Sequence, residues 1–214
     1  MPIGTSRLHL DVLDEPRRRV FDRLRALPRG GVLGGGTAIA LQLRHRYSYD
    51  FDVFYIGRDI PRRWLPPLAR RIGFRVQPIR DTDSELTVLV GSDVKLSLIA
   101  YPFASLHPVI RTPSIPLFDL RDLASSKAYT IGRRGEWRDY VDLHALLTGG
   151  HLTLRSVIRE AARRFDGAFS ETLFLQQLTY TGDLSDFSVD PIGRGPSRTT
   201  ILRFFEREVS RYTR

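Results

Sequence analysis

The segment LGGGTAIALQLRHRYSYDFDVF, residues 33–54, carries the strongest structural signal of the chain. Its three glycines, 34–36, predict a tight turn between a short strand at 31–33 and a helix that begins at Thr37. Residues 50–56 (DFDVFYI) alternate between two faces, which is the period of a strand. The segment therefore predicts a strand, a glycine turn, a helix and a second strand in direct succession.

Two carboxylates lie on one side of the second predicted strand. Asp50 and Asp52 are two residues apart, so their side chains point the same way. Paired carboxylates repel each other unless a cation lies between them, and such a pair suits Mg²⁺ or Mn²⁺. The glycine turn that opens the helix offers free backbone N–H groups to a triphosphate. The combination is typical of phosphoryl or nucleotidyl transfer from an NTP.

The rest of the chain divides into a part with strands and a part with helices. We expect an α+β protein with a mixed-sheet module at 1–115 and a helical module at 116–214, packed together. The expected strands are 31–33, 50–56, 74–79, 86–90 and 94–99, of which the last two form an antiparallel hairpin. The expected helices are 16–27, 37–43, 60–71, 119–132, 137–148, 153–165, 170–180 and 198–212, and 181–197 is expected to be a loop.

The amino-acid composition limits which kinds of metal site and which binding partners we expect. The chain has no Cys, and its five His residues show no zinc-ligand spacing, so we expect any metal to be a hard cation bound by carboxylates. The formal net charge of +9 favours a polyanionic partner such as RNA, although Arg can also serve solubility alone. No apolar run is long enough for a membrane span, and the first residues show no signal peptide, so we expect a cytoplasmic protein without a membrane partner.

The two lysines are informative because Arg supplies almost all of the positive charge. Of the 33 basic residues, only Lys95 and Lys127 are lysines. Where a chain uses Arg so consistently, a retained Lys indicates a position that needs a compact ammonium group.

The quoted segment resembles the hallmark of the AbiEii/AbiGii nucleotidyltransferase toxins, which belong to the polymerase-beta-like superfamily. The resemblance continues at VKLSL, 94–98, and at LRDLASSKAYTIGRRGEWRDYVDLHALL, 120–147. It implies a nucleotidyltransferase fold and transfer of a nucleotide from an NTP to an acceptor such as tRNA or another RNA. It also implies that the chain is the toxin of a pair with a cognate antitoxin protein.

The resemblance assigns roles to particular residues. The implied catalytic residues are Asp50, Asp52, Lys127 and Asp142, with Asp50 and Asp52 holding the metal. The implied nucleotide-binding residues are Gly35, Gly36, Thr37, Ser48, Lys95 and Lys127. Asp142 is expected to orient a lysine or to assist proton removal, whereas Asp139 fits a helix N-terminus. Arg44 and Arg46 either steer phosphate or lie on the surface.

One position departs from the family pattern. The second motif usually carries a carboxylate two residues after its lysine, and here that position is Ser97. Glu85 on a neighbouring strand could compensate. The substitution keeps two alternatives open: a degenerate module that binds nucleotide or RNA without catalysis, and a nucleotidyltransferase that acts on a protein or a small molecule.

Overall fold

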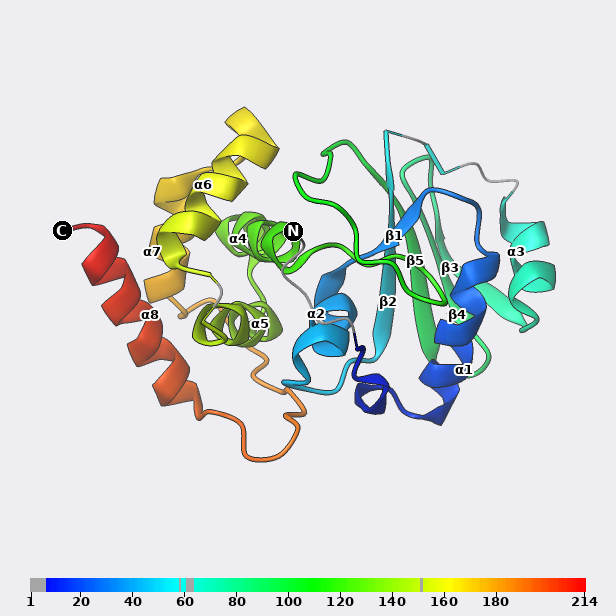
Figure 1. Ribbon diagram of the computed structural model, residues 1–214, viewed down its shortest axis with the longest axis horizontal. Coiled ribbons are helices and arrows are strands. Elements are labelled where there is room, and N and C mark those ends of the chain that lie inside the picture. The colour runs from blue at the N-terminus through cyan, green and yellow to red at the C-terminus, as the bar shows by residue number, and fades with distance from the viewer. Residues whose placement is uncertain (1–6, 58, 61–63, 151) are drawn as a thin grey trace.

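The core of the protein is a five-stranded mixed sheet with the strand order β1-β2-β5-β4-β3 (Figure 1). The computed structural model describes residues 7–57, 59–60, 64–150 and 152–214. Strands β2 and β5 are parallel, and the other neighbours are antiparallel. The strands are β1 (Gly31–Leu33), β2 (Asp50–Ile56), β3 (Val76–Asp81), β4 (Glu85–Val90) and β5 (Val94–Tyr101).

Strand β2 has the alternation that its sequence predicts. Phe51, Val53 and Tyr55 are fully buried, whereas Asp50 and Asp52 face the opposite, partly open side. The ring of Phe51 stacks at 6.4 Å on Phe21 of α1. Burial of the aromatic side therefore fixes which way the two carboxylates point.

Helices α1 (Glu15–Arg23) and α3 (Leu65–Ile72) lie beside the sheet at the end remote from the C-terminus (Figure 1). The carboxylate of Asp14 caps α1 by accepting from the Arg17 amide at 3.0 Å. The 3-10 turns η1 (Leu10–Val12) and η2 (Leu24–Ala26) flank α1. Helix α2 (Gly35–Leu43) packs on β2 and also contacts the C-terminal helices, so it joins the two parts of the molecule.

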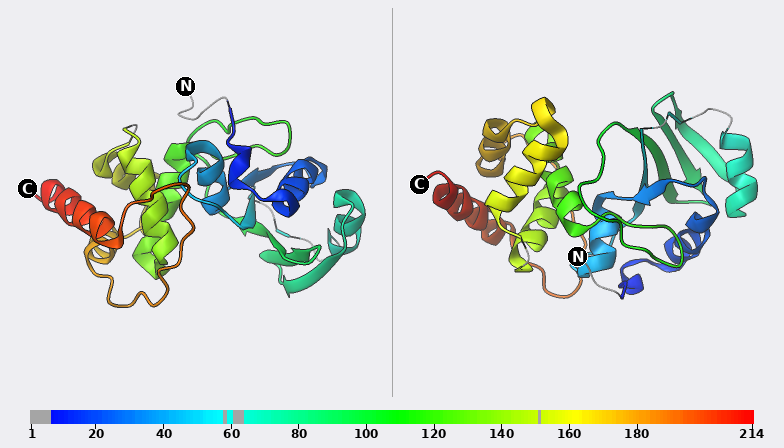
Figure 2. Two further views of the ribbon diagram at one scale, coloured as in Figure 1. Left: turned by 90° about the horizontal axis from the view of Figure 1, so that it is seen from below. Right: turned by 45° about the horizontal axis from the view of Figure 1, so that its top comes forward.

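The C-terminal part is a bundle of helices around α4, which contacts three of its neighbours (Figures 1 and 2). Buried Arg164 of α6 donates to the Asp122 carbonyl at 2.6 Å and thereby ties α6 to α4. The elements are α4 (Leu120–Arg134), α5 (Trp137–Thr148), α6 (Leu154–Phe165), the 3-10 turn η4 (Asp166–Ala168), α7 (Glu171–Thr179) and α8 (Arg198–Tyr212).

The α+β architecture and the expected strand–turn–helix–strand order are confirmed. Several boundaries differ from the predictions by one or more residues; β3, for example, covers Val76–Asp81 instead of 74–79. Three of the differences have a local cause or touch residues that the structure does not describe. The α2 helix begins at Gly35, because glycines 35 and 36 form its first turn. The α-helix predicted at 16–27 ends at Arg23 and tightens into η2 before Pro28. The helix predicted at 60–71 begins at Leu65, and residues 61–63 of that prediction lie outside the described residues.

The division at 115/116 stays a prediction. It falls in the segment between the end of β5 at Tyr101 and the start of α4 at Leu120.

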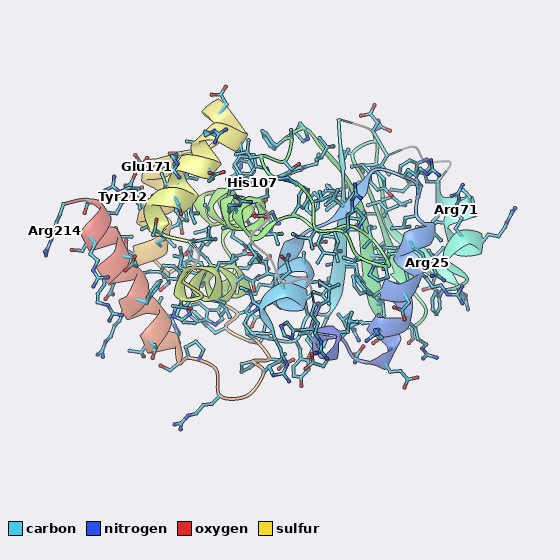
Figure 3. All side chains as sticks on the ribbon, in the orientation of Figure 1. Arg25, Arg71, His107, Glu171, Tyr212 and Arg214 are labelled. Carbon is cyan, nitrogen blue, oxygen red and sulfur yellow. The ribbon has the colours of Figure 1, made fainter. Side chains whose placement is uncertain are left out.

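Arginine side chains project at both ends of the molecule, as Arg71 and Arg214 illustrate (Figure 3). Positively charged side chains are therefore present at both ends of the molecule. Within the described ranges, no helix has both the length and the apolar character needed to cross a membrane.

Candidate active site

A cleft of about 1530 Å³ lies between the open face of the sheet and helix α4. Its walls come from the glycine turn, β2, β5, β4, α4, the start of α5 and part of the loop that precedes α8. The predicted residues that line it are Gly35, Gly36, Thr37, Arg46, Ser48, Asp50, Asp52, Lys95, Ser97, Lys127 and Asp139. Segments far apart in the sequence thus meet at one place.

The two aspartates of β2 lie at the centre of this cleft. Asp50 Oδ2 is 3.2 Å from Lys95 Nζ on β5 and 3.8 Å from an Arg138 guanidinium nitrogen. Burial raises the pKa of Asp52, and the neighbouring charge of Asp50 raises it further, against the opposing effect of Lys95. The pair is therefore a site of concentrated negative charge, which a cation would stabilise.

The glycine turn fits closely against this pair. Gly35 has a φ of +64°, and a Cβ there would lie 2.5 Å from Asp52 Oδ2. A Cβ on Gly36 would lie 2.0 Å from a guanidinium nitrogen of Arg46. The Gly34 amide donates to the Asp52 carbonyl at 2.9 Å. The glycines are thus required by the packing, and they place the N-terminus of α2 next to Asp52.

Two hydroxyl groups connect α2 to the chain entering β2. Thr37 Oγ1 is 2.7 Å from Ser48 Oγ, and the Thr37 hydroxyl also donates to the Asp50 carbonyl. Both residues are buried at the cleft wall. The predicted positions of Thr37 and Ser48 are therefore adjacent, and together they hold the start of β2 against the helix.

Lys127 of α4 is 8% exposed and reaches the cleft from the opposite wall. Its Nζ is 2.7 Å from Asp139 Oδ1 and 2.7 Å from Asp142 Oδ2, both on α5. Burial alone would lower the pKa of Lys127, but the charges of Asp142 and Asp139 outweigh burial and raise it. Lys127 is therefore a fixed, protonated cation, as a phosphate-binding role requires.

Asp142 lies behind Lys127 and is fully buried. Its Oδ1 accepts from Arg46 Nε at 2.6 Å and lies 2.7 Å from His45 Nε2, and its Oδ2 accepts from the second arm of Arg46 at 3.0 Å. Burial alone would raise the pKa of Asp142, but Lys127 and Arg46 outweigh it and hold the pKa well below its usual range. Of its two expected roles, this position favours orienting Lys127 over taking a proton from a substrate.

Of the two roles expected for Arg44 and Arg46, phosphate steering or a surface position, the surface position fits Arg44, whereas Arg46 is buried. Arg44 closes α2 in the left-handed region and pairs with Asp11 at 2.6 Å, outside the cleft lining. Arg46 reaches the cleft wall, but Asp142 holds its guanidinium in a bidentate pair. The predicted helix-terminus role of Asp139 is confirmed, because its carboxylate accepts from the Glu136 amide in a capping box.

Ser97 lies beside Asp52 in the parallel pairing of β5 and β2. On its other side it pairs with Thr87 of β4, whose hydroxyl is 3.1 Å from Ser97 Oγ. Thr87 in turn donates to Glu85 Oε1 at 2.7 Å. Thr87 and Glu85 line the cleft, and sequence reasoning raised Glu85 as a substitute but missed Thr87. The hairpin register, which no local sequence signal specifies, brings them there.

The loop before α8 is predicted from the sequence, but the sequence does not reveal that it forms part of the cleft wall. Residues Asp183–Asp186 and Ser188–Asp190 line the cleft. The Tyr47 amide donates to the Asp190 carbonyl at 2.8 Å, and the Tyr49 hydroxyl donates to the Asp190 carboxylate. The loop is thus attached to the segment that leads into β2.

The carboxylates of the cleft fit a magnesium ion whose remaining ligands come from a substrate. Within the described ranges, no cluster of three or more His, Cys, Asp or Glu side chains is arranged to hold a metal. Asp50 and Asp52 are two oxygen-bearing ligands, and Mg²⁺ is commonly held by one or two carboxylates plus substrate phosphates. Burial is the main cause of the raised pKa of Asp52 and the charge of Asp50 adds to it, so a cation between the two carboxylates would offset their repulsion.

The comparisons with known proteins agree with this arrangement. A family model described as the nucleotidyl transferase AbiEii toxin of a type IV toxin–antitoxin system matches residues 73–207, which is more than half of the chain. The match includes Lys95, Lys127 and Asp142 but begins after β2. The glycine turn and the two aspartates are therefore observations independent of that match.

The individual relatives have low sequence identity to this chain. An uncharacterized protein of Aquifex aeolicus is 28% identical over 189 residues, covering 84% of this chain and 86% of the relative. The structure of MenT4, a nucleotidyltransferase toxin of Mycobacterium tuberculosis, is 16% identical with a TM-score of 0.57, covering 90% of this chain and 81% of that one. JHP933 from Helicobacter pylori is 15% identical with a TM-score of 0.51, covering 92% and 91%. At these identities the two structures show the fold.

Proposed function

The chain belongs to the AbiEii nucleotidyltransferase toxin family, and from this premise we propose that it transfers a nucleotide from an NTP to an RNA hydroxyl in a Mg²⁺-dependent reaction. One observation carries the proposal. The carboxylates of Asp50 and Asp52, the glycine N-terminus of α2 and the buried cation of Lys127 line one cleft. These are the groups needed to bind a metal, a triphosphate and its developing charge.

Asp50 and Asp52 would hold the divalent cation, with remaining ligands supplied by the nucleotide phosphates and water. When bound, the cation neutralises charge on the phosphates and makes the α-phosphorus easier to attack. Lys95 Nζ lies 3.2 Å from Asp50 Oδ2 and compensates its charge. Because its side chain is partly exposed, Lys95 can turn from Asp50 toward a phosphate when the cation arrives.

Lys127 would stabilise the triphosphate from the other wall. An ammonium group has three N–H donors, and Asp139 and Asp142 occupy two of them at 2.7 Å. The third has no protein partner within the described part of the chain and can bind a phosphate oxygen. The α2 N-terminus, with Gly35 and Gly36, offers backbone N–H groups opposite Lys127. The phosphates would thus lie between α2 and α4.

RNA, with tRNA as the first candidate, is the acceptor that the charge supports best. The net charge of +9 favours a polyanion over a neutral small molecule. Arg133, Arg134 and Arg138 line the cleft at the junction of α4 and α5, where an acceptor strand could enter. As a member of a toxin family, the protein is further proposed to act on NTP under the control of a cognate antitoxin.

Incubation with each labelled NTP, Mg²⁺ and total RNA tests the proposal, with Asp52→Asn as the inactive control. We expect the label on RNA with wild type and none with the variant. Label on a protein or a small molecule would show that this molecule, and not RNA, is the acceptor. Nucleotide binding without any transfer would instead support the non-catalytic alternative.

A further inference from the structure

Four buried charged side chains form an ion cluster where α2, α4 and α5 meet. Its members are Arg46 from the segment after α2, Lys127 from α4, and Asp139 and Asp142 from α5, and each is at most 8% exposed. Lys127 Nζ lies 2.7 Å from a carboxylate oxygen of each aspartate. Arg46 donates to Asp142 through Nε at 2.6 Å and through its second arm at 3.0 Å. Asp142 is therefore shared between the two cations.

The formal charges of this ion cluster cancel only because Arg46 belongs to it. Lys127 alone would face the two negative charges of Asp139 and Asp142. Burial alone would lower the pKa of Arg46, but the charge of Asp142 outweighs burial and raises it, so Arg46 supplies a second positive charge. His45 Nε2 also lies 2.7 Å from Asp142, and its buried Nδ1 has no hydrogen-bond partner in the part of the chain that the structure describes. A neutral His45 leaves no N–H group unsatisfied there and adds no charge.

The ion cluster lies directly beneath the N-terminus of α2. A Cβ on Gly36 would be 2.0 Å from a guanidinium nitrogen of Arg46 and 3.2 Å from Asp142 Oδ2. Because the charged groups are buried, solvent ions screen them only weakly. An anion bound at this helix terminus therefore experiences the net charge of the ion cluster at short range. If Arg46 did not pair with Asp142, the negative charge of Asp142 would repel such an anion.

Resting on the triphosphate site of the proposed function, we propose that Arg46 is a positioning residue that keeps Lys127 available to the triphosphate by balancing the second carboxylate of the ion cluster. With Arg46 in place, Asp142 divides its hydrogen bonds between two cations, and the ammonium group of Lys127 keeps its attraction for a phosphate oxygen. Without Arg46, Lys127 alone would compensate both aspartates. One uncompensated negative charge would then oppose the incoming polyanion. Arg46 thus acts on the substrate through Asp142 and Lys127.

Calorimetric titration of inorganic triphosphate in the presence of Mg²⁺ tests this role without regard to which NTP or acceptor is used. Arg46→Gln removes one positive charge and should weaken binding about tenfold. Asp139→Asn removes one negative charge and should tighten binding about tenfold, and its amide oxygen can still accept from the Glu136 amide. The double variant restores the balance and should bind within about threefold of wild type. Mere structural damage would neither tighten binding nor be rescued by a second change.

Arg44→Gln is the matched control, because Arg44 carries the same charge two residues earlier but pairs with Asp11 and does not line the cleft. It should bind triphosphate within about twofold of wild type, and melting curves should show that each variant is folded. Arg46→Lys keeps the charge and should bind within about threefold of wild type. If Arg46→Gln does not fold, Arg46→Lys and Asp139→Asn decide the question.

The outcomes separate the role of Arg46 from the transfer reaction. An Arg46→Gln variant that binds triphosphate as tightly as wild type, or an Asp139→Asn variant that binds it more weakly, would overturn the role of Arg46. A wild type that binds no triphosphate would overturn both that role and the proposed function. Affinities that follow the charges in a protein that transfers no nucleotide to RNA would support the role of Arg46 and remove the transfer reaction. Transfer by a protein whose affinities do not follow the charges would overturn the role of Arg46 alone.

Discussion

Replacing Asp142 with Asn should destabilise the protein strongly, because this carboxylate compensates two buried cations. Asp142 is 0% exposed and has close contacts with Arg46, Lys127 and His45. The Asn side chain keeps the volume but removes the charge, and its amide N–H₂ would face donors. Removing one partner of a buried ion pair typically costs about 3–5 kcal/mol. In a chain of this length that corresponds to a melting temperature lower by roughly 6–20 °C.

Thermal unfolding followed by far-UV circular dichroism measures this effect. Asp183→Asn is the matched control. Because Asp183 is exposed on the loop before α8, this variant should melt within about 1 °C of wild type. Lys127→Met combined with Asp142→Asn should cost less than the sum of the two single changes, because the double variant leaves fewer buried charges unpaired. An Asp142→Asn variant that melts within about 2 °C of wild type would refute the reasoning.

The pH dependence of stability gives an independent check on the same carboxylate. The pKa of Asp142 in the folded protein is held well below its usual range by Lys127 and Arg46, which outweigh burial. A group with a depressed folded pKa contributes stability above its unfolded pKa, about 3.9, and loses it as the pH falls toward the folded pKa. The difference in free energy of unfolding between wild type and Asp142→Asn should therefore be constant above about pH 5 and shrink below pH 4.

Three further predictions concern catalysis and metal binding. Asp52→Asn should abolish nucleotide transfer while the protein stays folded, and transfer near the wild-type rate with Mg²⁺ would show that the metal assignment is wrong. Lys127→Arg keeps the charge, but the enclosed site accommodates a compact ammonium, so kcat should fall at least about tenfold; a fully active variant would show that charge alone matters there. Ser97→Asp should strengthen Mn²⁺ binding to the nucleotide-free protein in calorimetric titrations, because it adds a third carboxylate beside Asp52. Tight binding by wild type that the variant does not change would contradict this.

The parts of the fold that the sequence predicted are those with strong local signals. The alternation of DFDVFYI gave β2 and the direction of its carboxylates, and it is confirmed by the burial of Phe51, Val53 and Tyr55. The helix predicted at 198–212 is confirmed at these boundaries as α8. The start of α3 was less predictable, because Pro66 and Pro67 lie in its first turn, where proline is tolerated, and so do not mark the beginning of the helix by themselves.

Arg46 shows why side-chain roles were harder to predict than elements. In the sequence Arg46 lies four residues before Asp50, and either a phosphate-steering role or a surface position was open to it. Its actual partner, Asp142, is 96 residues away and meets it only when α5 packs on α2. The same contact requires Gly36, because a Cβ there would occupy the position of the guanidinium. One arginine thus explains a glycine that seemed to serve only phosphate, and it helps fix the carboxylate that orients Lys127.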